Sequence, residues 1–116
     1  MQAPDDRVTF PRQLRLTLKG DLEAVIRGGK RIRSRHLDIR CLASPLGHPR
    51  VGIVVPRHGH SAVDRNKLKR RLREIVRVHL LPTLPAIDLV IRSRPEAYGL
   101  SFATLATELA DVRSSI

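Results

Sequence analysis

Apolar residues recur at helical spacing in three segments of this chain, and they alternate or run together in three others. The longest helix is expected from residue 63 to residue 81, where Pro82 would end it. At about 3.6 residues per turn, its apolar side chains gather on one side, with His79 beside them. They are Leu68, Leu72, Ile75 and Val76. This side of the helix is therefore expected to lie in a core.

Two shorter helices are expected. Asp21 is placed as the N-cap of a helix over residues 22–27, which Gly28 and Gly29 would end. Ser101 is placed as the N-cap of a final helix. The apolar stripe of that final helix is Phe102, Leu105, Ala106, Leu109 and Val112.

Three strands are expected between the helices. Residues 36–43 alternate, as in a half-buried strand, whereas residues 51–55 and 87–91 are continuous apolar runs typical of buried strands. The order is helix, two or three strands, helix, strand, helix, which predicts an α+β fold with helices packed on one sheet. One domain is expected over residues 15–116, preceded by a flexible arm over residues 1–14.

Charge narrows the possible functions. The 116 residues carry a formal net charge of +11, and nucleic acid is the commonest partner for such a surplus, with an anionic membrane surface second. Aromatic residues make up only 3%, so charge and shape would have to supply most of the affinity for RNA.

A cytoplasmic location is expected. No apolar run approaches the ~20 residues that span a bilayer, and the N-terminal residues show no hydrophobic signal segment. A single cysteine, Cys41, fits a reducing compartment.

The predicted long helix carries most of the functional signal. Seven basic residues lie between Arg65 and Arg77, and Glu74 is the only acid there. The side opposite the apolar stripe gathers Asn66, Lys69, Arg70, Arg73 and Arg77. Salt bridges between side chains one turn apart cannot neutralise this stripe, because it contains only one acid. An external polyanion is therefore expected, which could be DNA, RNA or lipid.

The chain offers no catalytic constellation of its own. His58 and His60 in a loop lack the further ligands of a metal site. The carboxylates of Asp38, Asp64 and Asp88 are dispersed through the expected elements. A binding protein without catalytic or metal-ligating side chains is therefore expected.

The segment from Ala62 to Glu74, with its order Arg65-Asn66-Lys67-Leu68-Lys69-Arg70, resembles the signature of the bacterial ribonuclease P protein component. The strand at residues 51–55, the helix with its glycine stop at 21–29 and the Asp-containing strand at 87–91 also resemble that family. The similarity extends over roughly residues 14–109.

The resemblance implies a two-layer α/β sandwich in the order α-β-β-β-α-β-α, with a left-handed β-α-β crossover. It also implies the protein subunit of an endoribonuclease that removes the 5′ leader of precursor tRNA. The partners would be ribonuclease P RNA and precursor tRNA, with no membrane and no required protein oligomer. The RNA would supply the active site and hold the Mg²⁺ ions.

The resemblance assigns two sets of RNA-binding residues. Those for the ribozyme RNA are Arg65, Asn66, Lys67, Lys69, Arg70, Arg73 and Arg77. A cleft between the first helix and the sheet would hold the single-stranded leader, with Leu22, Ile26, Arg33, Arg35, Arg40 and Arg57 as candidates. Leu22, Ile26 and Arg40 stand where the family often has aromatics, so arginines are expected to replace base stacking there.

Two other functions remain open from sequence. A general or ribosome-associated RNA chaperone would bind many RNAs and give no stimulation of leader cleavage. A basic amphipathic membrane-surface protein is the other alternative, against which the interleaved buried strands argue.

Overall fold

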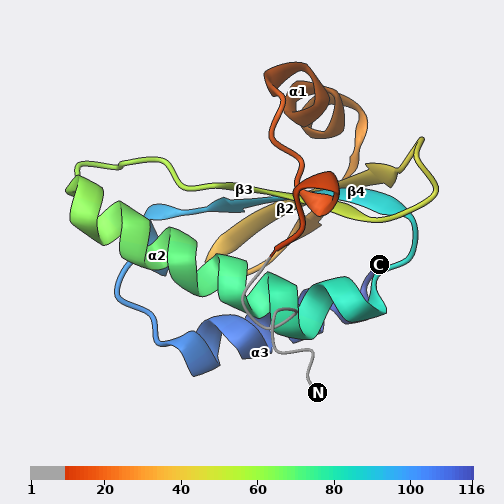
Figure 1. The fold of residues 1–116 in the computed structure, drawn as a ribbon. Coiled ribbons are helices and arrows are strands. Elements are labelled where there is room, and N and C mark those ends of the chain that lie inside the picture. The colour runs from red at the N-terminus through yellow and green to blue at the C-terminus, as the bar shows by residue number, and fades with distance from the viewer. Residues whose placement is uncertain (1–9) are drawn as a thin grey trace.

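In the computed structural model, which describes residues 10–116, a four-stranded sheet separates one helix from two others (Figure 1). The helices are α1 (Lys19–Gly28), α2 (Ala62–Ile75) and α3 (Phe102–Ser114). The strands are β1 (Lys30–Arg33), β2 (Leu37–Ala43), β3 (Arg50–Val54) and β4 (Ile87–Ser93). The chain order α-β-β-β-α-β-α is the expected one.

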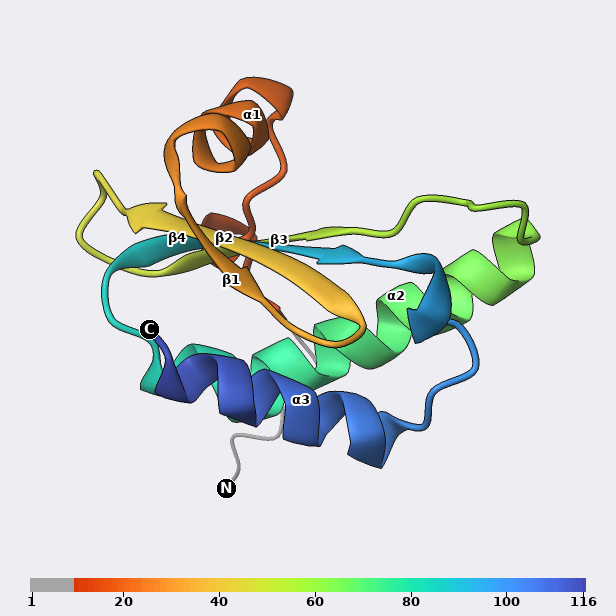
Figure 2. The ribbon, with the colours of Figure 1, turned by 180° about the vertical axis from the view of Figure 1, so that it is seen from behind.

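The sheet has the strand order β1-β2-β4-β3. β1 pairs with β2 and β2 with β4 in antiparallel fashion, while β3 and β4 are parallel. The parallel pair is joined through α2, and the two opposite views show that this crossover is left-handed (Figures 1 and 2). Most such connections are right-handed. The expected fold class is confirmed.

The two faces of the sheet bury different side chains because residues alternate along each strand. Leu37, Ile39, Leu89 and Ile91 face α2 and α3 and form the main core with the apolar stripes of those helices. On the other face a small cluster of Leu16, Val25 and Val90 packs under α1. This second layer is thin, so much of that face carries polar side chains.

Arg50 forms a buried ion pair between β3 and β4 and also contacts a partly exposed carboxylate on α1. Arg50 on β3 donates from Nη2 to Oδ2 of Asp88 at 2.7 Å and from Nη1 to Oδ2 of Asp21 at 3.3 Å. Asp88 is 4% exposed. The hydrogen bond to Asp88 raises the pKa of Arg50 more than burial lowers it. Asp21 is thus not the expected N-cap: α1 begins at Lys19, with Leu18 in the cap position, and the Asp21 carboxylate binds Arg50 instead.

The long helix differs from its expected course at the C-terminal end. Regular α-helix stops at Ile75, and a π-helical segment, Val76–Leu80, leads to a 3-10 turn, Leu81–Thr83. Pro82 lacks an amide hydrogen and would clash with the preceding turn of an α-helix. The wider π-turn rotates His79 outward and turns Leu80 to the buried side. The expectation that His79 lies on the apolar side was therefore wrong.

The two ends of the described chain differ in how well they match expectation. Ser101 caps α3 by accepting a hydrogen bond from the backbone nitrogen of Thr104. Of the expected arm over residues 1–14, residues 1–9 lie outside the described part. Residues 10–14 are not the flexible arm that was expected, because Phe10 is buried in the main core and Leu14 packs against that core. No helix in the described part of the chain has the length and apolar character needed to cross a bilayer.

Candidate nucleic-acid interface

The outer side of α2 presents mainly cations. Asn66, Lys67, Arg70 and Arg73 are exposed and Lys69 is half-buried. Glu74 binds Arg77, with 2.5 Å between Oε2 and Nη2, and this hydrogen bond lowers the pKa of Glu74. One charge of the predicted stripe is therefore neutralised within the helix, three residues apart, and the others remain.

Two arginines of α2 also hold neighbouring backbone. Arg65 is half-buried and donates from Nε to the carbonyl oxygen of Val55 at 2.9 Å. Arg71 donates from Nη1 to the carbonyl oxygen of Leu100 at 3.1 Å. The first bond fixes α2 to the end of β3 and the second to the loop before α3. Arg65 therefore has a structural role beside the binding role that its motif implies.

A hollow of about 260 Å³ connects α2 with the N-terminal segment. Lys69 and Arg73 line it from α2, and Arg15 and Leu22 line it from the other side. Arg15 is held in place by a 2.6 Å hydrogen bond from Nε to the carbonyl oxygen of Phe10. The basic surface of α2 thus continues past the edge strand β3 toward α1. Sequence reasoning missed Arg15, which no local pattern links to residues more than fifty positions away.

On the opposite face of the sheet, the structure brings Leu22, Ile26 and Arg40 together at α1. Arg40 donates from Nη1 to the carbonyl oxygen of Ile26 at 2.9 Å. Leu22 lies directly over Gly52, where a Cβ atom would stand only 2.6 Å from its Cδ2. A Cβ atom there would also lie 2.7 Å from the backbone oxygen of Leu16, which cannot move aside as a side chain can, so glycine is required at this position. The Nε atom of Arg40 is buried and has no hydrogen-bond partner.

The same sheet face carries a cationic hollow of about 320 Å³. It is lined mainly by Arg31, Arg33, His58, Arg92 and Arg94. Asp38 is its one acidic lining residue, and it pairs with Arg31 at 3.1 Å. Of these cations the sequence analysis named only Arg33 for the leader. The sequence did contain a signal for Arg31 and Arg92. Each stands next to an apolar strand residue, so alternation along the strand would place it on the opposite face of the sheet.

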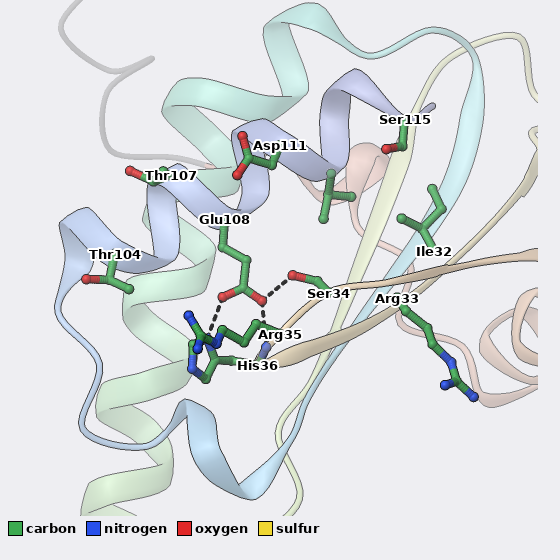
Figure 3. A pocket seen from close by; sticks show the side chains of 11 residues that line it. Ile32, Arg33, Ser34, Arg35, His36, Thr104, Thr107, Glu108, Asp111 and Ser115 are labelled. Carbon is green, nitrogen blue, oxygen red and sulfur yellow. Dashed lines mark hydrogen bonds and ion pairs between the residues drawn. The ribbon is translucent and has the colours of Figure 1, made fainter.

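Arg35 lies in a different place from the other leader candidates. It lines a hollow of about 530 Å³ between the β1–β2 turn and α3 (Figure 3). Arg33, at the end of β1, lines both hollows, and Arg57 is exposed in the loop before α2. The expected grouping of Arg35 with the α1 cleft is therefore not what the geometry gives.

The turn that carries Arg35 is fixed to α3 by Glu108. Its carboxylate accepts hydrogen bonds from the Ser34 hydroxyl, from the His36 backbone nitrogen at 2.7 Å and from the His36 ring Nδ1 at 2.7 Å (Figure 3). Burial raises the pKa of Glu108, but these hydrogen bonds together lower it by more than burial raises it. The pKa therefore lies below its ordinary value. The cluster is a structural junction, because Glu108 is fully engaged in holding the turn.

Metal-ligating side chains do not cluster among residues 10–116. No three His, Cys, Asp or Glu side chains in that range lie close enough to hold a metal ion. The described residues thus form two separate cationic surfaces, one along α2 and the hollow with Arg15, and one on the α1 face of the sheet around Arg33 and Arg92.

Comparison with known proteins agrees with this geometry. A family model described as Ribonuclease P matches residues 10–116. The ribonuclease P protein component of Syntrophobacter fumaroxidans is 37% identical over 97 residues, covering 82% of this chain and 81% of that protein. That of Acidothermus cellulolyticus is 37% identical over 101 residues, covering 85% of this chain and 84% of that protein. The solved RNase P protein from Thermotoga maritima superposes with a TM-score of 0.78 at 28% identity, covering 88% of this chain and 96% of that one.

Proposed function

The chain belongs to the ribonuclease P protein family, and from that premise we propose how its two basic surfaces divide the binding of RNA. Membership makes it the protein component of a ribonucleoprotein endoribonuclease that acts in tRNA 5′ processing. Its partners as a family member are ribonuclease P RNA and a tRNA substrate.

The α2 surface is proposed as the docking site for ribonuclease P RNA. Support comes from the exposed cations Lys67, Arg70 and Arg73, which no carboxylate in the described chain neutralises. A rigid helix holds these charges at fixed spacing, so phosphate contacts cost little ordering of the protein. Asn66 adds an amide that can both donate and accept hydrogen bonds to RNA.

The α1 face of the sheet is proposed to hold the 5′ leader as a single strand. The observation that carries this assignment is the cationic hollow, where Arg33, Arg92 and Arg94 converge on one open surface with a single carboxylate. Guanidinium groups bind phosphate and stack on bases, which compensates for the missing aromatics. Leu22, Ile26 and Arg40 would contact the same single-stranded leader where it passes α1.

The chemistry of cleavage is assigned to the RNA partner. The Mg²⁺ ions that activate water and stabilise the leaving oxygen are proposed to be held mainly by that RNA, and no residue of this chain is assigned to them. The chain's own contribution is to bind the ribozyme and the leader together and to screen their mutual repulsion with its charge.

The proposal also includes a cytoplasmic location, no requirement for a protein oligomer and no membrane partner. Cytoplasmic placement is supported by the lone cysteine. The alternative of a general RNA chaperone is not favoured, since the relatives found are ribonuclease P protein components.

Reconstitution tests the division of roles. The chain is combined with a bacterial ribonuclease P RNA, and cleavage of a precursor tRNA is followed at low Mg²⁺ concentration. Stimulated removal of the leader is expected, with a larger gain in affinity for precursor than for mature tRNA. Equal binding of unrelated RNAs without stimulated cleavage would instead indicate the chaperone.

A further inference from the structure

A second hollow on α2, on the flank that faces α3, has features that the charged stripe alone does not explain. Its volume is about 330 Å³. Asp64, its one carboxylate, lines it together with Lys67 and Arg71 from α2. His60 lines it from the loop before that helix, and Tyr98 and Gly99 line it from the loop before α3. We propose that this hollow binds one unpaired nucleotide of the ribonuclease P RNA, with its base on His60 and its phosphate between Lys67 and Arg71. This rests on the proposed docking of α2 to that RNA.

The floor of the hollow is a stacked pair of rings. The imidazole of His60 lies on the phenol ring of Tyr98 with 3.8 Å between ring centroids and 6° between ring planes. The Tyr98 hydroxyl donates to the carbonyl oxygen of Pro56 at 2.8 Å, which fixes the lower ring. The upper ring is held from the side by Asp64, whose Oδ2 lies 3.6 Å from Nδ1 of His60. Both rings are therefore positioned without RNA.

The upper ring remains accessible. The His60 side chain is 39% exposed although one of its faces is covered by Tyr98. A flat ring that is covered on one face and partly exposed to solvent is a platform on which another ring can stack. Only an unpaired, unstacked base has a free face to offer, because the bases of a duplex already cover one another.

Two cations stand beside this platform at the spacing of one helical turn. Arg71 donates one N–H to the Leu100 carbonyl oxygen, which orients its guanidinium. The ammonium of Lys67 has no carboxylate partner among residues 10–116. A ring platform beside two cations matches the parts of a nucleotide, one base and one phosphate. The volume lies at the lower end of the ~300–1,000 Å³ that small ligands occupy.

The test compares His60→Ala, which removes the upper ring of the pair, with His60→Phe, which keeps a flat ring there. Affinity for ribonuclease P RNA is measured by filter binding, and chemical probing of unpaired bases locates the contact. His79→Ala is the matched control, since His79 is exposed at the far end of the helix. Thermal unfolding of each variant monitors the fold.

We expect His60→Ala to weaken RNA binding roughly 5- to 150-fold, as loss of one base stack does, and to expose one unpaired base that the unaltered protein protects. His60→Phe and His79→Ala should bind within about twofold of the unaltered chain. Equal binding and equal footprints for all three variants would overturn the inference, as would a loss with His60→Phe as large as with His60→Ala. If the unaltered chain itself fails to bind this RNA, the proposed function fails instead.

Discussion

Arg65 donates a hydrogen bond from Nε to the carbonyl oxygen of Val55 at 2.9 Å and thereby connects the first turn of α2 to the end of β3. The same side chain opens the motif that marks the helix as an RNA-binding element. Its guanidinium can do both because Nε bonds the backbone while the two terminal nitrogens are available for phosphate. Arg65 therefore both holds α2 in place and contributes positive charge to its surface.

Substituting Arg65 and Arg70 should separate these two roles. Arg70→Ala should weaken binding to ribonuclease P RNA by roughly tenfold and reduce the slope of log affinity against log salt by ~0.7–0.9. Arg65→Ala should have the same effect on RNA and also lower the free energy of unfolding by about 1 kcal/mol. Salt-dependent binding and urea unfolding measure the two effects. A purely structural Arg65 would leave the salt slope unchanged.

The leader face should respond to Arg92 and not to Arg35. Arg92→Ala removes a cation from the hollow on the α1 side of the sheet, whereas Arg35→Ala removes one from the turn beside α3. In the reconstituted enzyme, the first variant should lose affinity for precursor tRNA severalfold and keep its affinity for mature tRNA. The second variant serves as the matched control. Equal losses for both would place the leader across both sides of the hairpin.

Asp88 should be the acidic residue most important for stability. It is 4% exposed and receives two hydrogen bonds from Arg50, at 2.9 Å and 2.7 Å. Asp88→Asn leaves the Arg50 guanidinium buried without its main counter-charge, which should cost about 3 kcal/mol of unfolding free energy. Asp111→Asn, at an exposed position of α3, should change it by no more than ~0.5 kcal/mol. Comparable stability of the two variants in urea would contradict the assigned role of the ion pair.

Acidification should loosen the junction between the β1–β2 turn and α3. The pKa of Glu108 in the folded chain lies below its ordinary value of 4.5, so the carboxylate stabilises the fold fully above about that pH. This contribution is lost as the pH falls from there through the folded-state pKa. Glu108→Gln should therefore be less stable than the unaltered chain at pH 7 and lose less stability between pH 5 and pH 3. Thermal unfolding across that range checks the sign, and an identical pH profile for both proteins would refute it.

Local periodicity predicted the elements well. Leu37 and Ile39 are buried on β2 as their alternation required, and Ser101 caps α3 as its position before an apolar stripe indicated. Errors occurred where tertiary contacts or the proline changed the local course. Asp21 was expected to cap α1, but its carboxylate binds Arg50. His79 was expected on the buried side, but the π-helical turn before Pro82 places Leu80 in the core.

The assignment of RNA-binding residues remains a prediction, but the structure arranges its members in space. The motif residues Asn66 and Arg70 are exposed on one helix face, as their spacing required. The leader candidates are divided, since Arg40 lies at α1 and Arg35 on the α3 side of the turn.

By itself, the sequence determined the basic amphipathic helix, the strands, the surplus of charge and the resemblance to a family, because these depend on residue types at short, regular spacing. Only the tertiary structure decided that Arg15 meets Lys69 and Arg73, and that Tyr98 lies beneath His60. Those neighbours are far apart in the chain, and their side chains meet only because the left-handed crossover and the packing on both faces of the sheet bring them together. The basic helix follows from the local order of residues, whereas the His60–Tyr98 ring pair and the hollows on either side of α2 exist only in the folded chain.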